Sequence, residues 1–350
     1  MQAWQAIALL SAVAAANLTF VPVQPAATAD THFVSRHGRV LLRDGQPFRF
    51  VGVNCYRLAE VSNRADEILG HLAAHGVKVV RFWAFQKRCG SSGREFARFD
   101  ALVAAAKRHD VLLLPVLENH WNHCTYARRG TVKQREWYAS GWREQSFDGA
   151  PLSYSDFIRA IGEHFRDERQ ILAWQLMNEP EIYPDSEESF VVLQRFAREA
   201  TAELKSADPN HLVSFGLLGL GQPSTMGKHF RALHNFREMD LVAAHDHGYI
   251  YEPLAGHAWP RRENSFYADL CDARSLLKPF VATESGIALE WVTGDRAYRA
   301  QLFRAKLDAF FAAGGSGYIL WNYEPEPDTD YGFGPDDPVM ETIAVVASRL

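Results

Sequence analysis

The sequence predicts an α/β fold, a single (β/α)8 TIM barrel with an N-terminal hairpin, on three observations. Apolar strand-like runs alternate with helix-like runs eight times along the 350 residues. The links at one end of these units are short, whereas those at the other end are long and polar, as in a closed parallel barrel. No low-complexity linker divides the chain, and barrels of this kind reach such a length as one unit, so residues 30–350 are expected to form one domain.

The strands are expected in short apolar runs that stop at polar or aromatic side chains. A strand or hairpin is expected first, from Asp30 to Val40, and Asp44-Gly45 gives its turn signal. The eight barrel strands then follow in chain order. They cover residues 47–54, 77–83, 111–117, 174–179, 211–216, 240–245, 279–284 and 317–322.

Helices are expected between the strands because apolar residues recur there with helical spacing. The first three apolar faces are Ile68, Leu69, Leu72 and Ala73; Phe96, Phe99, Leu102, Val103 and Ala106; and Phe157, Ile158, Ile161 and Phe165. Later helices are expected at residues 187–205, 228–236, 265–277, 297–311 and 339–350. A long polar loop rich in tryptophan, residues 121–152, separates the third strand from its helix.

Composition narrows the class of ligand. Hydrophobic residues make up 47% of the chain and charged residues 23%, as in a globular protein with a large core. The formal net charge of −5 provides no basic stripe for nucleic acid or anionic lipid. Aromatic residues make up 12% and include 9 tryptophans, so a neutral ligand that stacks on rings, such as a sugar, is the better expectation.

The N-terminus has features of an export signal. Residues 7–16 are apolar or small, and Ala27-Thr-Ala29 before Asp30 has the small-x-small form of a cleavage site. No Lys or Arg precedes the apolar run, so residues 1–29 are expected to be either a signal peptide or a retained N-terminal anchor. The run is too short to favour a spanning helix, and a secreted or extracellular protein is expected.

Export would permit disulfides among the four cysteines. Cys89 and Cys124 follow neighbouring expected strands, so they are expected to pair with each other. Cys55 and Cys271 are expected to be buried free thiols. No CxxC motif occurs, which leaves a zinc–cysteine cluster unsupported.

Two glutamates end buried strands and are the candidate catalytic pair. Trp174-Gln-Leu-Met-Asn-Glu-Pro180 is an apolar run that stops at Glu179, and Pro279-Phe-Val-Ala-Thr-Glu-Ser-Gly286 stops at Glu284. Either one alone could cap a strand or join a surface ion pair. In a parallel barrel, however, the carboxyl ends of the strands converge, so both side chains are expected at one mouth, about 5 Å apart. A pair at that spacing suits cleavage of a glycosidic bond with retention, and Glu179 should then titrate above Glu284.

Other strand ends supply groups for the same site. Arg81 is expected beside Glu284, where it would keep that carboxylate ionised, although a core-edge ion pair is the plain alternative. Asn178 could bond a sugar 2-hydroxyl or cap its strand, and Trp321 could form a flat platform under a sugar ring or fill the core. The remaining candidates at the strand ends are Asn54, Trp83, His120, Trp121, His245 and His247.

Two alternatives from other functional classes follow from the same residues. His245-Asp-His247 has the HxH spacing of barrel metallohydrolases, and His120-Asn-Trp-His123 adds two more candidate ligands. That class would be expected to carry HxH on its first strand, which here ends in Asn54-Cys-Tyr56. A non-catalytic sugar-binding barrel would keep the aromatic residues but could lose a glutamate, whereas both are present.

Taken together, these motifs resemble glycoside hydrolase family 5, a retaining barrel family of clan A, and within it the β-mannanase-like members. The resemblance runs from Phe48 to Pro325. Its specific marks are Trp174-Gln-Leu-Met-Asn-Glu-Pro180, Thr283-Glu-Ser-Gly286, Val80-Arg-Phe-Trp83 and Glu118-Asn-His-Trp121. It implies Glu179 as the acid/base and Glu284 as the nucleophile. It also implies supporting groups at Arg81, His120, Asn178 and His245, with Trp321 as the sugar platform.

The chain departs from the family pattern after the sixth strand. The family has a tyrosine two residues beyond the strand-six histidine, and its phenol contacts the nucleophile. Here His247 holds that place and Tyr249 follows two residues later. Either Tyr249 fills the role after a shift of the loop, alone or together with His247, or His247 replaces the phenol.

The resemblance implies a retaining hydrolase of β-linked polysaccharide or oligosaccharide, with β-1,4-mannan as the first candidate substrate. A β-glucanase or cellulase, or an exo-β-glycosidase of the same family, is the alternative. No cofactor and no metal is implied, no nucleic acid or stable membrane span is expected, and a monomer is expected. Trp137, Tyr138 and Trp142 in the long third loop could line sugar subsites or pack beneath the loop.

Overall fold

The expected barrel is confirmed. The computed structural model describes residues 32–122, 125–126, 132–219, 222–247 and 266–350. Eight parallel strands form one sheet in the order β8-β7-β6-β5-β4-β11-β10-β9. They are β4 (Phe50–Asn54), β5 (Val79–Trp83), β6 (Leu112–Val116), β7 (Ala173–Asn178), β8 (Leu212–Gly216), β9 (Val242–His245), β10 (Phe280–Glu284) and β11 (Gly317–Leu320). The edge strands β8 and β9 meet through a parallel bridge between Leu217 and Ala244, which closes the sheet into a barrel.

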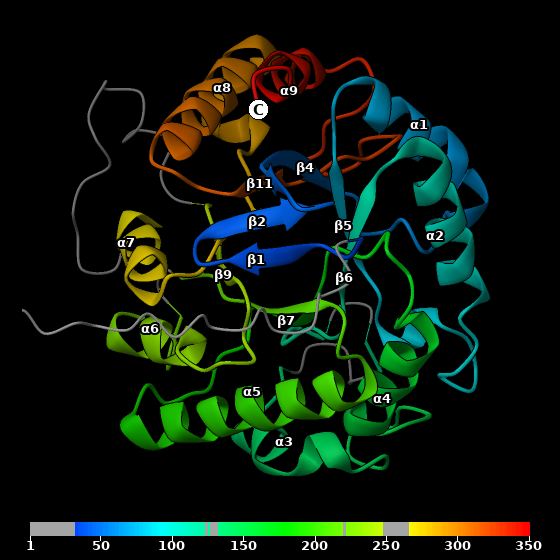
Figure 1. Ribbon diagram of the computed structural model, residues 1–350, viewed down its shortest axis with the longest axis vertical. Helices are drawn as coiled ribbons and strands as arrows, with labels where there is room; N and C mark the ends of the chain where they lie inside the picture. The colour runs from blue at the N-terminus through cyan, green and yellow to red at the C-terminus, as the bar shows by residue number, and fades with distance from the viewer. Residues whose placement is uncertain (1–31, 123–124, 127–131, 220–221, 248–265) are drawn as a thin grey trace, which may run out of the picture. The chain divides into compact units, whose positions relative to one another are not determined.

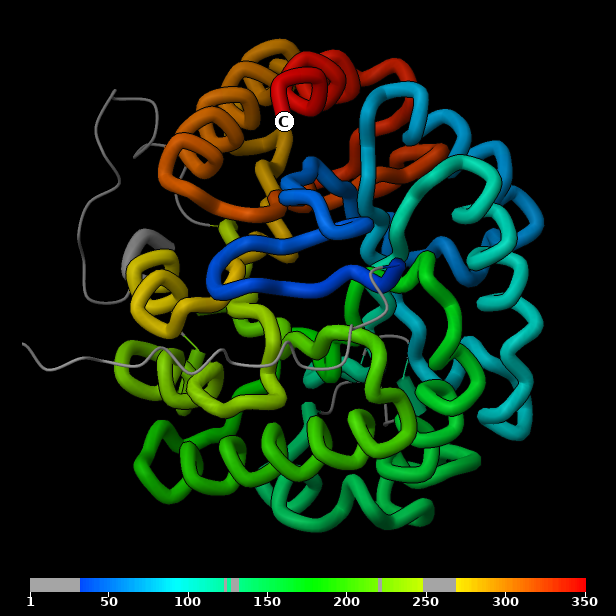
Figure 2. Tube along the Cα trace, viewed as in Figure 1, coloured from blue at the N-terminus to red at the C-terminus, as the bar shows by residue number. Residues whose placement is uncertain are grey.

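Helices follow the strands and surround the sheet (Figures 1 and 2). They are α1 (Ala65–Ala74), α2 (Ala97–His109), α4 (Tyr154–Phe165), α5 (Glu187–Ala207), α6 (Lys228–His234), α7 (Phe266–Leu276), α8 (Arg296–Ala312) and α9 (Pro338–Ala347). Several begin at an oxygen-bearing side chain that accepts a hydrogen bond from the first turn, as at Ser153, Ser186 and Asp295. Comparison of these bounds with the expected ones confirms the helix positions to within a few residues at each end.

The N-terminal hairpin is larger than expected and covers the amino-terminal end of the barrel. It contains β1 (Ser35–His37), β2 (Val40–Arg43) and β3 (Gln46–Phe48). Asp44 and Gly45 both have positive φ angles, 51° and 74°, which confirms the predicted turn between β2 and β3. Val34 and Leu41 pack against residues at the starts of the barrel strands, so the hairpin covers the core at the amino-terminal end of the barrel.

The single strand expected at residues 47–54 is wrong, because the run divides into β3 and β4. The first part pairs with β2, and the second pairs with β5 and β11 inside the barrel. The change of sheet falls at Arg49, whose Nε donates to the carbonyl of Gly315 at 3.1 Å. One apolar run can serve two sheets in this way, and periodicity alone does not reveal the division.

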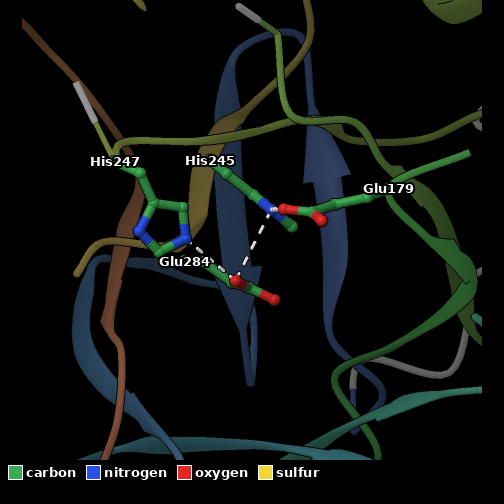
Figure 3. A group of neighbouring side chains, drawn as sticks. All are labelled: Glu179, His245, His247 and Glu284. Atoms are coloured by element: carbon green, nitrogen blue, oxygen red, sulfur yellow. Dashed lines mark hydrogen bonds and ion pairs between the residues drawn. The ribbon is translucent and has the colours of Figure 1, made fainter. Parts of the chain in front are cut away.

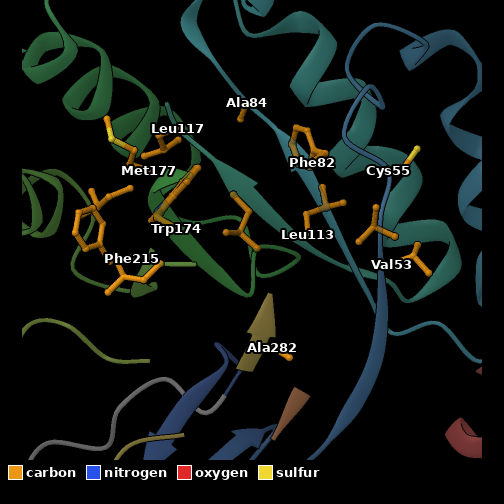
Figure 4. Packing of buried hydrophobic residues seen from close by; sticks show 14 of the residues in the cluster. Val53, Cys55, Phe82, Ala84, Leu113, Leu117, Trp174, Met177, Phe215 and Ala282 are labelled. Atoms are coloured by element: carbon orange, nitrogen blue, oxygen red, sulfur yellow. The ribbon is translucent and has the colours of Figure 1, made fainter. Parts of the chain in front are cut away.

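The main hydrophobic core lies between the barrel and the helices. Figure 4 shows part of it, with Phe82, Leu113 and Trp174 directed toward the helix layer. Trp174 is fully buried and its indole N–H donates to Asp208 Oδ2 at 2.6 Å, so its polar edge is satisfied inside the core. The opposite face of each strand points into the barrel, where polar residues approach the mouth.

The aromatic residues of the third loop belong to this core and do not line a sugar cleft. The loop contains the short helix α3 (Arg135–Ala139), and Trp137, Tyr138 and Trp142 are all buried. Each of the three rings lies 5.3–5.4 Å from the ring of Phe196 on α5. Of the two roles left open by the sequence, packing beneath the loop is therefore the one observed.

The cysteine predictions are partly confirmed. Cys55 is a buried free thiol, as expected, but Cys271 is exposed on α7, so the prediction of its burial is wrong. Cys89 is a buried free cysteine, and Cys124, its expected partner, lies outside the described residues. The N-terminal segment of residues 1–29 also lies outside them. None of the helices in the described ranges is long and apolar enough to cross a bilayer.

The burial of the loop aromatics predicts the effect of removing one of them. Trp142→Ala should lower the free energy of unfolding by about 3–5 kcal/mol, because it leaves a cavity beside Phe196, with little change in KM for an oligosaccharide. Urea unfolding and steady-state kinetics measure the two effects. Trp291→Ala, at a tryptophan that is 37% exposed, is the matched control and should cost clearly less stability than Trp142→Ala. A raised KM with unaltered stability for Trp142→Ala would contradict this assignment.

Candidate active site

The two candidate glutamates face one another at the barrel mouth. Glu284 is the last residue of β10, and Glu179 directly follows β7. A side-chain oxygen of Glu179 lies within 4.8 Å of one of Glu284, and His245 stands between the two side chains (Figure 3). The separation agrees with the roughly 5 Å that retaining hydrolysis requires. The expected juxtaposition of residues far apart in sequence is therefore present.

Arg81 fixes the position of Glu284. Its Nη1 donates to Glu284 Oε1 at 2.5 Å and to Asn54 Oδ1 at 2.7 Å. Its Nη2 donates to Asn178 Oδ1 at 2.6 Å, and its Nε to Gln175 Oε1 at 2.8 Å. The guanidinium of this β5 residue is fully buried. One carboxylate oxygen and three amide oxygens around it accept its hydrogen bonds. Such a charge is held in place because each of these contacts compensates part of its lost hydration.

The environment of Glu284 favours its ionised form. Burial alone would raise the pKa of this carboxyl, but the positive charges of His245 and Arg81, with a hydrogen bond from His247, hold its pKa well below the ordinary value. Glu284 is consequently a carboxylate over the whole neutral range, the form that a nucleophile needs.

Glu179 is held by both its backbone and its carboxylate. Its φ angle of 46° is in the left-handed region, which non-glycine residues seldom adopt. Its N–H donates to the carbonyl of Gly216 at 2.8 Å, and Gln222 donates to its carbonyl at 3.1 Å. Its carboxylate accepts the indole N–H of Trp121 at 2.7 Å and contacts His245 Nδ1 at 2.8 Å. The side chain is therefore aimed at the mouth in one orientation.

The protonation of Glu179 depends on its neighbours. Burial raises the pKa of this carboxyl, yet the hydrogen bond and charge of His245 outweigh burial and lower the pKa below its ordinary value. The negative charge of Glu284 acts in the raising direction. Because the pKa values of both glutamates are lowered in the free protein, the expected order, with Glu179 above Glu284, stays a prediction.

His247 occupies the place where the resembled family has its tyrosine. Its Nε2 lies 3.0 Å from Glu284 Oε2, so the imidazole makes the contact expected of the phenol. Room for the ring depends on Gly286, since a Cβ there would stand 2.7 Å from His247 Nδ1. Tyr249 lies outside the described residues. Of the possibilities that the sequence left open, a contact from His247 is the one observed.

Asp246, between the two histidines, joins three other elements at a buried point. Its N–H donates to the carbonyl of Glu284 at 2.7 Å, and its carboxylate accepts the hydroxyl of Tyr318 on β11 at 2.6 Å. Lys306 on α8 lies 3.2 Å from Asp246 Oδ1 and donates to the Asp246 carbonyl at 2.9 Å. The Tyr318 hydroxyl in turn meets that of Ser285 at 2.7 Å. This cluster fixes the end of β9 against the end of β10.

Several other predicted residues take supporting positions. His120 is only 1% exposed and bonds the Tyr138 hydroxyl at 2.9 Å, with its ring edge-on to Trp121. It therefore packs between Trp121 and Tyr138, and its Nε2 lies 3.5 Å from Glu181 Oε1. Asn178 is engaged at both ends of its amide in the free protein, since Nδ2 donates to Asn119 at 3.1 Å. Because the amide nitrogen carries two hydrogens, its expected bond to a sugar hydroxyl does not require the loss of that contact.

Trp83 and Trp321 form an aromatic wall with Tyr56. The ring of Tyr56 stacks on Trp321 at 5.1 Å and lies 4.6 Å from Trp83. Trp83 is largely buried, whereas Trp321 is partly exposed. Trp321 is thus partly accessible, as a platform must be, and the ring that stacks on it is that of Tyr56.

Sequence reasoning missed several polar groups that organise the site. They are Tyr56, Asn119, Gln175, Gln222 and Asp246. A polar residue in an apolar strand was the available signal for Gln175, which faces into the barrel. Its amide reaches Arg81 because residue 216 is a glycine, where a Cβ would stand 2.6 Å from Gln175 Oε1.

The chain is similar to several known proteins in sequence and fold. The family model for GH family 5 β-mannosidase-like proteins matches residues 154–257. The chain is 26% identical to a probable mannan endo-1,4-β-mannosidase F of Neosartorya fischeri, over 89% of this chain and 72% of that protein. It is 26% identical to mannan endo-1,4-β-mannosidase F of Aspergillus clavatus, over 74% of this chain and 65% of that one, so it spans only about two thirds of that relative.

A solved structure shares the fold. The endo-β-1,4-mannanase of Thermotoga petrophila matches with a TM-score of 0.70 and 22% identity, over 87% of this chain and 77% of that one. Together these comparisons confirm the resemblance to the β-mannanase-like members of glycoside hydrolase family 5 and the barrel fold. They also support a glycoside hydrolase.

The lowered pKa of Glu284 predicts a pH-dependent contribution to stability. Its carboxyl has a pKa below the unfolded value of about 4.3. The ionised form therefore contributes stability above about pH 4, and the contribution is lost as the pH falls toward the folded-state pKa. Glu284→Gln should cost about 3–5 kcal/mol at pH 7, because Arg81 is left without its charge partner.

Urea unfolding of wild type and Glu284→Gln at pH 7, 5, 4 and 3 tests this. The difference between the two proteins should shrink below about pH 4. Glu188→Gln, at an exposed carboxylate paired with Arg135, is the control and should give a small difference at every pH. A difference between wild type and Glu284→Gln that is constant with pH would refute the assignment.

The Asp246 cluster predicts a non-additive pair of substitutions. Asp246→Asn leaves the Lys306 ammonium buried without a carboxylate and should lower the free energy of unfolding by about 3–5 kcal/mol. Asp246→Asn combined with Lys306→Met should recover a large part of that loss, because no unpaired charge remains. A double-mutant cycle by urea unfolding measures the coupling; simple additivity would show that the two groups do not act as a pair.

Proposed function

We propose that this chain is a retaining hydrolase of β-1,4-linked mannan that works by double displacement. The single observation that carries the proposal is the approach of Glu179 and Glu284 to within 4.8 Å, at the end of a barrel where substrates of such folds bind. In the first step Glu179 gives a proton to the glycosidic oxygen while Glu284 attacks the anomeric carbon. In the second, Glu179 takes a proton from water, which releases the sugar from Glu284.

The contacts of Glu179 suggest how one residue serves as acid and then as base. Burial and the negative charge of Glu284 raise the pKa of Glu179, whereas the hydrogen bond and charge of His245 and the charge of His247 lower it in the free protein. When Glu284 becomes an ester, its negative charge disappears. The pKa of Glu179 then falls, which suits the deprotonation of water.

Mannan is proposed as the substrate because of the named relatives. Those from Neosartorya fischeri and Aspergillus clavatus are mannan endo-1,4-β-mannosidases, and the matching family description is β-mannosidase-like. The proposal accordingly includes cleavage within chains. Its β-glucan alternative remains in the substrate panel, since the choice depends on the orientation of one hydroxyl.

Secretion and domain organisation are parts of the same proposal. Residues 1–29 would direct export, and residues 30–350 would form the catalytic domain. Export suits a polymeric substrate, because a polysaccharide lies outside the cell that degrades it.

Activity on mannan, glucomannan, cellulose derivatives and aryl β-glycosides tests the proposal. Wild type should release reducing sugar from mannan, with the anomeric configuration of the first product retained by NMR. Glu284→Gln should release almost none, whereas equal release by the two proteins would favour a non-catalytic sugar-binding barrel. Activity should also persist in a chelator, and its loss there would favour a metallohydrolase.

Glu179→Gln distinguishes the acid from the nucleophile. Its kcat on mannan should fall about 10²–10⁴-fold, because a sugar is a poor leaving group that needs protonation. On an aryl glycoside with a nitrophenolate leaving group the first step needs little acid, so an accumulated glycosyl-enzyme should appear as a burst of phenolate. Glu284→Gln should show no burst. Equal losses on both substrates, without a burst, would remove Glu179 from the acid/base role.

A further inference from the structure

The two glutamates and two histidines of the candidate active site form a cluster of potential metal ligands. Glu179 Oε1 lies 2.8 Å from His245 Nδ1, which lies 3.6 Å from Glu284 Oε2, which lies 3.0 Å from His247 Nε2. One ligand atom from each residue lies within 4.8 Å of all the others. A tetrahedral Zn²⁺ site with bonds of about 2.0–2.1 Å has ligand–ligand edges of about 3.3 Å. The three contact distances, 2.8, 3.6 and 3.0 Å, lie on either side of that value.

The outer oxygens of both carboxylates are already held by donors. Glu284 Oε1 accepts from Arg81 and Glu179 Oε2 accepts from Trp121, so the other oxygen of each remains for the centre. Metal-binding carboxylates are commonly oriented in this way by a hydrogen bond to the oxygen that does not bind. Trp121 and Arg81 thus act as supports that would hold the two inner oxygens toward an ion.

The site is also accessible. The side chains of Glu179 and His247 are 16% and 24% exposed, whereas those of His245 and Glu284 are buried. An ion could therefore enter past two partly exposed ligands and meet two fixed ones. His247 is decisive, because it adds a second imidazole where the resembled family has a phenol, and paired imidazole and carboxylate ligands suit divalent first-row transition ions.

We infer that Glu179, His245, His247 and Glu284 bind a divalent transition-metal ion such as Zn²⁺, and that the bound ion competes with the glycan. The binding step is independent of the proposed function, whereas inhibition rests on it. A bound ion occupies the oxygen with which Glu284 would attack, and it removes the lone pair that Glu179 needs to carry a proton. Zinc here blocks hydrolysis and is not a resident cofactor.

Calorimetric titration of tag-free, chelator-treated full-length protein with Zn²⁺ tests the binding. Wild type should bind one ion with micromolar or tighter affinity, and Co²⁺ should give the visible bands of a four-coordinate site. His247→Tyr, which restores the family's residue, should weaken binding at least about tenfold. His164→Gln, at a surface histidine paired with Asp100, is the matched control and should retain wild-type affinity.

Thermal unfolding verifies that His247→Tyr is folded; if it is not, Glu179→Gln carries the same test. Absence of Zn²⁺ binding by wild type overturns the inference, as does equal affinity in wild type and the folded ligand variant. In wild type, Zn²⁺ should raise the apparent KM for mannan-oligosaccharides and a chelator should reverse this. Bound Zn²⁺ without inhibition would overturn the competition. Intact, His247-dependent binding in a protein with no glycosidase activity would count against the proposed function alone.

Discussion

The contact between Arg81 and Glu284 is the interaction on which the rest of the site depends. Both groups are buried, and an isolated charge of either sign would be too costly to hold there. Their pairing explains why so many amides gather nearby: Asn54, Gln175 and Asn178 each accept from the guanidinium. The amides come from two strands, β4 and β7, and Glu284 comes from a third, β10, so closure of the barrel itself assembles the acceptor set. The packing of the barrel strands and the reactivity of Glu284 therefore both depend on the Arg81 guanidinium.

A buried polar cluster likewise fixes the ends of β9 and β10. The ends of these strands carry the histidines and Glu284, and a shift between them would break their contacts. Asp246, Lys306, Tyr318 and Ser285 oppose such a shift because they satisfy one another at buried positions. A buried polar cluster of this kind tolerates few arrangements, so it suits a role in maintaining geometry.

His247 gives this chain a site with different electrostatic properties from one closed by a phenol. An imidazole can carry a positive charge beside Glu284, and the charge of His247 is among the causes of the low pKa of that carboxyl. The imidazole is also a metal ligand in its neutral form, which a protonated phenol is not. One substitution therefore alters both the charge around the nucleophile and the ions that the site can attract.

The sequence by itself determined the barrel, its strand order and the two glutamates. Alternating apolar runs with helical and strand spacing are local signals, and the convergence of parallel strand ends follows from the topology that they define. Tertiary structure alone decided that residues 47–54 serve two sheets, that Trp137, Tyr138 and Trp142 surround Phe196, and that His120 packs edge-on against Trp121. It also decided that Gln175 and Asp246 organise the charges. The reason is that burial and hydrogen-bond partners are set by residues distant in the chain, whose side chains meet only after the barrel closes.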